Sequence, residues 1–346
     1  PSPFLGEAPE AETPPPAGEL AWQQRRAALV LGAVADTRAP PVGEEGVRGG
    51  AGLLESQAAC PFRAFARHRL RLAAPEEPAP GLNALERGVL LHGALFSLWG
   101  RLGDSATLAS LDGADRRRHC DASAEAAMDA LGPERRQVLG GACLALEQRR
   151  LAGTLASWLE IEAARPEPFT VLEREATAEL ELAGLVLKLK LDRVDRLADG
   201  GELVIDYKSG STKLSGLFGE RIESPQLPLY SLVRGPALAG VAFAQLRPRE
   251  LRLQSAGVGP GLPDLEKNLA KHLAGDPLAE DWEGLRDAWR ERLTALATEV
   301  MAGEAAVQPT AGACRYCDLA SLCRIGTVED AAADGDAGSA LAGAEG

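Results

Sequence analysis

Polar and hydrophobic positions alternate along the middle of the chain. Between residues 187 and 192 three leucines alternate with charged residues, which is the period of a strand with one buried face. A second apolar run, Glu202-Leu203-Val204-Ile205, follows the turn-forming sequence Ala198-Asp199-Gly200-Gly201, as in a β-hairpin. The strands expected from this pattern are 170–182, 185–197, 202–208, 240–245 and 250–254.

Hydrophobic residues at helical spacing predict helices on both sides of these strands. One begins at Glu86 and continues to Trp99, and another is expected to begin at Ser224 as the N-cap, with Pro225 in the first helical position. The remaining helices are expected at 19–34, 53–72 with a break at Pro61, 105–164 with interruptions near Gly132 and Gly140, 262–273 and 278–302.

The two ends of the chain differ in composition from the rest. Residues 1–20 are rich in Pro, Glu and Ala, and the residues from 327 onward are rich in Ala, Gly and Asp. We therefore expect a linker with one helix at 1–52, a folded domain at 53–326 and a flexible tail at 327–346. Because residue 1 is a proline, we expect the chain to be a processed product or a piece of a longer protein.

The end of the strand at 202–208 carries the sequence Asp206-Tyr207-Lys208. Side chains two residues apart on a strand share a face, so Asp206 and Lys208 should enter one cleft while Tyr207 turns away. Asp192, on the neighbouring strand of the hairpin, should converge on the same cleft. Carboxylates bind divalent cations, and a lysine beside them steadies an attacking water or a phosphate oxygen. A lone D-x-K is more often a surface salt bridge, so its surroundings decide the interpretation.

Those surroundings form an ordered series. His92 precedes the strands, and Gln226 and Tyr230 follow them at positions i and i+4 of a helix. With RGVLLH, KLDRVDRL, LVIDYKSG and SPQLPLY in this order, the chain resembles nuclease domains of the RecB and AddB type in the PD-(D/E)xK superfamily, from roughly Leu53 to Arg324. The resemblance implies an α/β fold with a restriction-endonuclease-like core, a mixed sheet flanked by helices, and a helical insertion at about 104–165.

The resemblance also implies roles for single residues. The implied ligands of Mg²⁺ or Mn²⁺ are His92, Asp192, Asp206 and the backbone carbonyl of Tyr207. Lys208 is the implied catalytic lysine, and Gln226 and Tyr230 would position the DNA strand and support the site.

Other interpretations of these acidic and basic residues stay open. A lone histidine on an apolar helix is often a core residue. Glu173 or Glu175, on the preceding strand, could reach the metal. Asp195 is expected to be a structural partner of Arg193 or Arg196 rather than a ligand.

Six cysteines supply a second signature. Cys314, Cys317 and Cys323 form a C-x2-C-x5-C motif, and Cys60 lies far upstream. Four thiolates suit a tetrahedral zinc ion or a [4Fe–4S] cluster, and the spacing leaves both open. The resemblance favours an iron–sulfur cluster that staples the two ends of the domain together, with zinc as the alternative occupant. Cys120 and Cys143 lie in helical sequence and are expected to be bystanders, and disulfides are not expected without a signal peptide.

The net charge of −13 argues against a DNA-binding protein, because phosphate contacts need a basic face. Much of the excess lies at the ends, with −4 in residues 1–46 and −5 in residues 329–346. Basic residues gather locally after Cys60 and along the proposed cleft. DNA binding is therefore expected to be weak without a partner. No apolar run is long enough to span a membrane.

The implied function is that of a metal-dependent (exo)deoxyribonuclease that processes DNA ends in double-strand break repair or recombination. Its expected partners are DNA and a helicase subunit or an upstream helicase-like module, and its expected location is the bacterial-type cytoplasm, at the nucleoid. Two alternatives remain. One is a non-catalytic DNA-binding or scaffold module that keeps the nuclease fold and cluster, and the other is a zinc-stabilised interaction domain in which the D-x-K is coincidental.

Overall fold

A computed structural model describes residues 37–43, 46–47, 49–74, 81–259, 261–263 and 281–325. The predicted helix at 19–34, nearly all of the one at 262–273 and the predicted tail lie outside these ranges. No helix within them is both long and apolar enough to cross a lipid bilayer.

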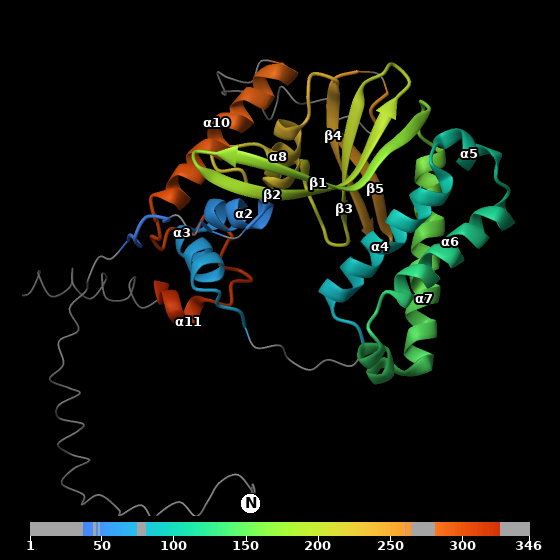
Figure 1. Cartoon of the computed structure of the whole chain (residues 1–346), viewed down its shortest axis with the longest axis horizontal. Helices are drawn as coiled ribbons and strands as arrows, with labels where there is room; N and C mark the ends of the chain where they lie inside the picture. The colour runs from blue at the N-terminus through green and yellow to red at the C-terminus, as the bar shows by residue number, and fades with distance from the viewer. Residues whose placement is uncertain are drawn as a thin grey trace, which may run out of the picture. The chain divides into compact units, whose positions relative to one another are not determined.

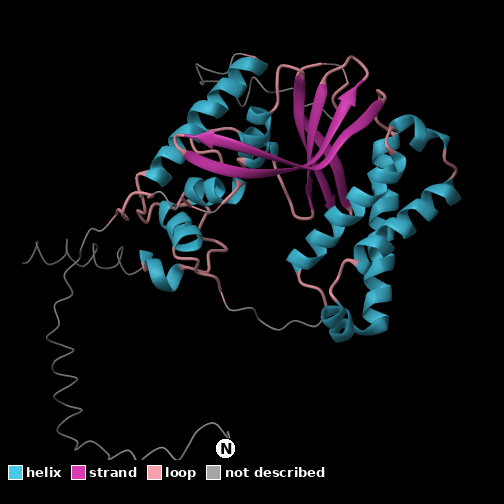
Figure 2. Cartoon of the chain, viewed as in Figure 1, coloured by secondary structure: helices cyan, strands magenta, loops and turns pink. Residues whose placement is uncertain are grey.

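A mixed sheet of five strands, in the order β1-β2-β3-β4-β5, forms the centre of the described fold (Figures 1 and 2). Adjacent strands are antiparallel except β3 and β4, which are parallel and connected through helix α8. The α/β class with a mixed sheet flanked by helices is therefore confirmed. The strands are β1 (Phe169–Leu182), β2 (Leu185–Leu197), β3 (Glu202–Lys208), β4 (Leu238–Arg247) and β5 (Glu250–Gly257).

One face of the sheet packs against a first group of helices. Leu187, Leu189 and Leu191 of β2 share a buried core with Trp289 and other apolar residues of this group. The alternation of leucine and charge in the sequence is thus the inside–outside alternation of β2. The elements of this side are α2 (Ala51–Ala59), α3 (Pro61–Ala64), the π-helix η1 (Phe65–Arg69), the 3-10 helix η2 (Leu214–Leu217), α8 (Gln226–Val233) and α10 (Trp282–Met301).

The opposite face packs against the predicted helical insertion. Leu155 and Trp158 lie in one core with Ile205 and Tyr207 of β3, so the insertion forms a layer of the fold. Its helices are interrupted near the predicted glycines. Gly132 caps the last helix, and Gly140 has a left-handed φ of 72° inside it. The insertion comprises α5 (Ser105–Ser110), α6 (Gly113–Asp129) and α7 (Pro133–Ala163), and α4 (Ala84–Leu102), which carries His92, precedes it on the same face.

The predicted start of α8 is wrong in detail. The helix begins at Gln226, Pro225 occupies the cap position, and no side chain caps the helix. Ser224 instead packs against η2, where its N–H donates to the Gly216 carbonyl at 2.9 Å. A Cβ at Gly216 would lie 2.7 Å from Ser224 Oγ, so this close approach requires glycine. A tertiary contact therefore takes Ser224 away from the capping role that its residue type favours.

Candidate metal centre and catalytic cleft

Asp206, Tyr207 and Lys208 divide between the two faces of the sheet as their spacing predicted. Asp206 is fully buried at the end of β3, and Lys208 Nζ lies 2.8 Å from its Oδ2 atom. Tyr207 points to the other face, where its hydroxyl accepts a hydrogen bond of 3.3 Å from Arg193. The carboxylate and the ammonium thus form a pair at the strand end.

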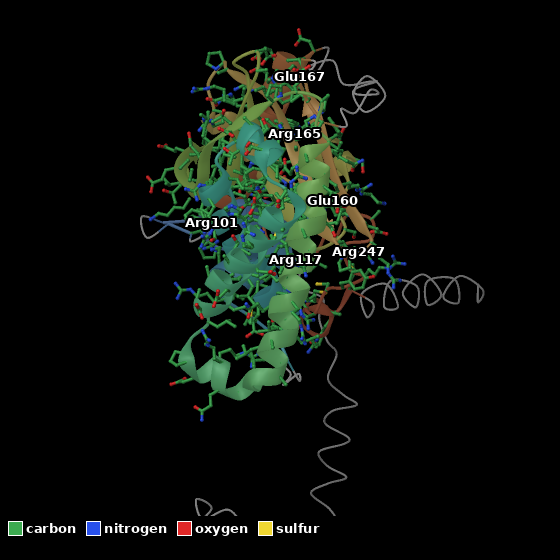
Figure 3. The ribbon with its side chains drawn as sticks, turned by 90° about the vertical axis from the view of Figure 1, so that its right-hand side faces the viewer. Arg101, Arg117, Glu160, Arg165, Glu167 and Arg247 are labelled. Atoms are coloured by element: carbon green, nitrogen blue, oxygen red, sulfur yellow. The ribbon has the colours of Figure 1, made fainter. Side chains whose placement is uncertain are left out.

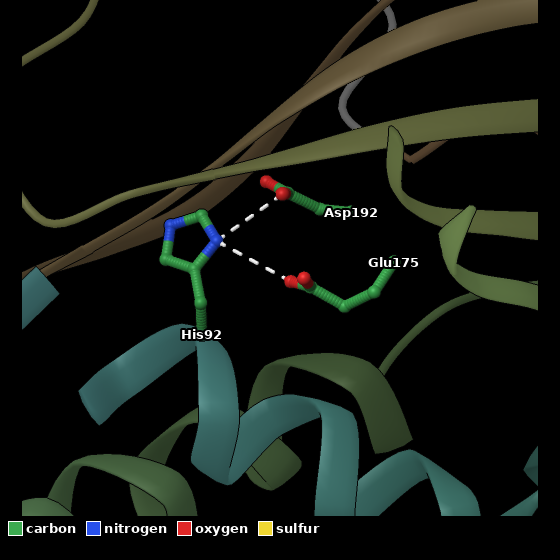
Figure 4. Close-up of side chains that lie close together, drawn as sticks. All are labelled: His92, Glu175 and Asp192. Carbon is green, nitrogen blue, oxygen red and sulfur yellow. Dashed lines mark hydrogen bonds and ion pairs between the residues drawn. The ribbon is translucent and has the colours of Figure 1, made fainter. Parts of the chain in front are cut away.

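Asp192 connects β3 with helix α4. Its Oδ2 atom accepts a hydrogen bond of 2.8 Å from the backbone N–H of Tyr207, and its Oδ1 atom lies 3.1 Å from Nδ1 of His92 (Figure 4). His92 therefore faces the carboxylates and is not a core residue. Burial disfavours its charged form, but the hydrogen bond to Asp192 and the charges of Asp192, Asp206 and Glu175 outweigh this, so the pKa of His92 is raised.

Glu175 completes a three-residue group. Its Oε1 atom lies 3.9 Å from His92 Nδ1, and the ligand atoms of His92, Glu175 and Asp192 all lie within 4.8 Å of one another (Figure 4). Two carboxylates and an imidazole are suitable ligands for Mn²⁺ or Mg²⁺, so these residues fit a divalent ion. Of the two glutamates that the sequence left open, Glu175 is the one at the site. Glu173 instead binds Arg234 at 2.8 Å.

Asp206 lies beside this group rather than within it. Its Oδ2 atom has the ammonium of Lys208 beside it, and its buried Oδ1 atom has no hydrogen-bond partner among the described residues. Burial raises the pKa of Asp206 to about 6, in spite of the opposing charge of Lys208. A buried carboxylate oxygen without a partner is costly, so the Oδ1 atom of Asp206 fits a metal-binding role.

A chain of hydrogen bonds holds Lys208. Its ammonium donates to Gln226 Oε1, and the Gln226 amide donates to the Tyr230 hydroxyl at 2.6 Å. That hydroxyl in turn donates to the backbone carbonyl of Lys190 at 2.5 Å. The i, i+4 spacing of Gln226 and Tyr230 therefore reports a real contact on one face of α8.

An open cleft of about 850 Å³ lies over this group, and neither Asp206 nor Lys208 is among the residues that line it. His92, Glu175 and Asp192 contribute to it, with Gln226 and Tyr230 beside them. Helix α4 adds the exposed apolar side chains of Leu85, Val89 and Phe96 to one wall, and β2 adds Lys188 and Lys190 to another. The cleft thus combines carboxylates, an imidazole and ammonium groups, the set that metal-assisted phosphodiester hydrolysis requires.

A family model described as the PD-(D/E)XK nuclease superfamily matches residues 51–324. The chain belongs to this superfamily. PD-(D/E)XK proteins are nucleases that generally depend on divalent metal ions, which agrees with the His92–Glu175–Asp192 group and the adjacent Asp206–Lys208 pair. No curated protein matches the chain. One solved structure, titled "Crystal structure of SSO0001", aligns at 13% identity with a TM-score of 0.28, covering 79% of this chain and 94% of that one, and a likeness this weak carries no argument.

Behind the PD-(D/E)XK site lies a buried network of charges. Arg193 is completely buried, and its guanidinium donates two hydrogen bonds to Asp195, of 2.6 and 2.7 Å, and two to Glu162, of 2.6 and 3.4 Å. Arg165 donates to the same two carboxylates. The expected pairing of Asp195 with Arg193 is confirmed. Glu162 and Arg165 come from α7 and its end, and their part in the network was not foreseen.

The arginines of the helical layer are largely engaged with neighbouring acids. Arg135 pairs with Glu86, and Arg150 with Glu147. Arg101 and Arg117 lie on the exposed side of this layer, and Arg117 pairs there with Asp121 at 3.5 Å (Figure 3). One lysine of β2 and one of β3 contact the catalytic group directly, since Lys190 pairs with Glu175 and Lys208 with Asp206.

The C-terminal segment runs beside the helix that follows Cys60. Phe62 donates its backbone N–H to Ala306 at 3.0 Å, and Thr310 donates to Ala59 at 2.9 Å. Arg67 and Asp318 form an ion pair between the same two segments. The fold thus brings the neighbourhood of Cys60 to the cysteine motif.

Cys60 and the three cysteines of the motif are not gathered as a zinc tetrahedron in the described structure. Zinc–sulfur bonds of about 2.3 Å would place the sulfurs within about 4 Å of one another, and no three of these sulfurs lie within 4.8 Å. Cys60 is buried, Cys314 is exposed, and Cys317 and Cys323 are half-buried. Outside this set Cys120 is buried, and burial raises the pKa of its thiol to about 11, as expected of an inert bystander.

Proposed function

We propose that this protein hydrolyses phosphodiester bonds of DNA with Mg²⁺ or Mn²⁺. The observation that carries the proposal is the convergence of His92, Glu175 and Asp192 next to the Asp206–Lys208 pair. The ion would be held by these three side chains and Asp206, with the Tyr207 carbonyl as a further ligand. When bound, the ion would lower the pKa of a water molecule and neutralise charge on the scissile phosphate.

The remaining side chains of the cleft would position the reacting groups. Lys208 would donate hydrogen bonds to the phosphate oxygen that gains negative charge, or orient the attacking water. Gln226 and Tyr230 support the proposal because they already fix the ammonium of Lys208 and the backbone of Lys190. Rigid placement of a charged donor is the main contribution that a protein makes to such chemistry.

The narrower proposal is an exodeoxyribonuclease that processes DNA ends in double-strand break repair or recombination, with a helicase partner or module. Its support is the resemblance of the four sequence motifs to RecB- and AddB-type domains. The net charge of −13 also favours a partner, since a strongly acidic chain binds DNA weakly alone. Such work would take place in the cytoplasm, at the nucleoid.

We further propose that Cys60, Cys314, Cys317 and Cys323 hold a [4Fe–4S] cluster, with zinc as the alternative. The hydrogen bonds between residues 59–62 and 306–310 support this proposal because they bring the two cysteine-bearing segments together. Cluster binding would then stabilise the fold by fastening its ends. No hydrolytic role is assigned to the cluster.

The test is degradation of end-labelled linear DNA, single-stranded and double-stranded, by anaerobically purified protein with Mg²⁺, Mn²⁺ or EDTA. Asp192→Asn and Glu175→Gln should remove cleavage, whereas Glu173→Gln, which alters a neighbouring carboxylate bound to Arg234, should retain it. The labelled end reports the polarity. Folded protein that cleaves neither substrate with either metal would contradict the proposal and favour the scaffold alternative.

A further inference from the structure

Glu175 is shared between the metal-binding group and Lys190. Its Oε1 atom faces His92, while its Oε2 atom forms an ion pair with the ammonium of Lys190. We propose that a divalent ion takes Glu175 away from Lys190, and that the released ammonium then binds a phosphate of the polynucleotide. Metal binding and substrate binding would thereby be coupled. This inference rests on the proposed function.

The backbone directs Glu175 into the cleft. Arg174 lies opposite Arg193 and Ala176 opposite Leu191, so Glu175 stands across from Asp192 on the neighbouring strand. Its φ of 51° is left-handed, a conformation that glutamate in a strand adopts only at a cost. Such strain persists where the surrounding structure enforces it, and here it turns the carboxylate toward the group.

Arg174 on β1 holds the backbone beside Glu175 in place. The guanidinium of Arg174 donates to the Phe96 carbonyl at 2.7 Å and lies 4.6 Å from the centre of the Phe96 ring. A Cβ at Gly100 would collide with this guanidinium, so glycine leaves it room. Arg174 therefore ties the backbone next to Glu175 to α4, the helix that carries His92.

The side chain of Lys190 has more room to move than the side chain of Glu175. Its side chain is 62% exposed, against 18% for Glu175, while its backbone carbonyl is held by Tyr230. A divalent ion beside Asp192 attracts the Glu175 carboxylate more strongly than a single ammonium does. Only the Lys190 side chain then needs to swing, from Glu175 toward the open cleft that it already lines.

Lys188 supplies a matched control. It lies two residues away on the same face of β2, lines the same cleft and is 83% exposed. Its acidic neighbour at 4.0 Å is Glu179, which does not belong to the metal-binding group. Loss of Lys188 therefore removes a cation from the cleft without releasing Glu175.

The first experiment measures Mn²⁺ affinity by titration calorimetry on the full chain without DNA. We expect Glu175→Gln to weaken binding by about tenfold or more, as for removal of a group that orients or binds a metal. Lys190→Met should tighten binding several-fold in the wild-type background and have no effect in the Glu175→Gln background. Lys188→Met should leave the affinity near that of the wild type. An equal effect of Lys190→Met on Mn²⁺ affinity in both backgrounds would overturn the inference. It would show that Lys190 acts only by long-range repulsion of the ion and not through Glu175.

The second experiment measures binding of a labelled oligonucleotide in a Lys208→Met background that does not cleave it. Lys190→Met should lower the affinity with Mn²⁺ and leave it unchanged without metal, whereas Lys188→Met should lower it equally in both conditions. Equal losses of oligonucleotide affinity for the two variants, with and without Mn²⁺, would contradict the proposed release of Lys190 from Glu175. The nuclease proposal would remain intact. Absence of Mn²⁺ binding to the wild-type chain would overturn the proposed function and this inference together.

Discussion

The backbone N–H of Tyr207 donates a hydrogen bond of 2.8 Å to the carboxylate of Asp192. This bond fixes one Asp192 oxygen against β3 and leaves the other facing His92. Tyr207 itself is held from behind by Arg193. Tyr207, the middle residue of the D-x-K sequence, therefore connects the His92–Glu175–Asp192 group with the buried charge network.

The burial of Asp206 predicts an unusual pH dependence of stability in metal-free protein. Its folded pKa of about 6 lies above the ordinary value of 3.8, so the folded state holds this proton more tightly. Stability should therefore fall as pH rises from about 4 to about 6, by on the order of 3 kcal/mol. Asp206→Asn should be more stable than the wild type above pH 7 in EDTA, measured by urea unfolding. Equal stability of the two proteins across this range would contradict the assignment.

The same pKa predicts the pH dependence of metal binding. Protons and divalent ions compete for Asp206, so Mn²⁺ affinity should decrease as pH falls through about 6. Titration calorimetry between pH 5 and 8 measures this loss. In Asp206→Asn the overall affinity should be lower and its decline near this pH shallower.

Tyr230→Phe should slow cleavage with little loss of stability. The substitution removes the hydroxyl that links Gln226 to the Lys190 carbonyl, so Lys208 loses part of its support. We expect a decrease in kcat of about tenfold or more, as for a displaced catalytic group, and a change in unfolding free energy of about 1 kcal/mol. A kcat unchanged from the wild type would show that the hydrogen-bond chain does not position Lys208.

Arg193→Met should strongly destabilise the fold. It would leave Glu162 and Asp195 buried with Arg165 as their remaining partner, and breaking a buried ion pair costs about 3–5 kcal/mol. Arg196→Met, an exposed arginine three residues along the same strand, is the control and should change stability by less than about 1 kcal/mol. Urea unfolding of the two variants compares them, and similar stability losses would refute a special role for the network.

Cys317→Ser should abolish bound iron and the visible absorbance of anaerobically purified protein, whereas Cys143→Ser should preserve both. The proposed cluster fastens the C-terminal segment to the region of Cys60, so its loss should also lower the melting temperature. Metal analysis of the wild type distinguishes the two occupants. Neither iron nor zinc in the wild type would contradict a four-cysteine site.

Local periodicity was sufficient to predict much of the fold and part of the site. The alternation in β2 predicted its buried leucines, and the spacing of Asp206 and Lys208 predicted their shared face. These features depend only on strand geometry, which repeats every two residues. The contact between Gln226 and Tyr230 followed from helix geometry in the same way.

Features that depend on long-range packing could not be read from local pattern. Glu173 and Glu175 have the same strand periodicity, and only the local backbone and the tie from Arg174 to α4 single out Glu175. Glu162 lies 31 positions from Arg193, and no sequence signal joined them. The prediction of Ser224 as the N-cap of α8 was wrong for the same reason. Ser224 contacts Gly216, and this tertiary contact outweighed the local preference of serine for a cap position.

The most direct test of the central claim is the position of the metal ion itself. Crystals soaked in Mn²⁺ and measured at the manganese absorption edge would show where the ion binds. The account predicts an anomalous peak between His92, Glu175 and Asp192, adjacent to Asp206, and no peak there in Asp192→Asn. A manganese peak elsewhere in the chain with this cleft empty would contradict it.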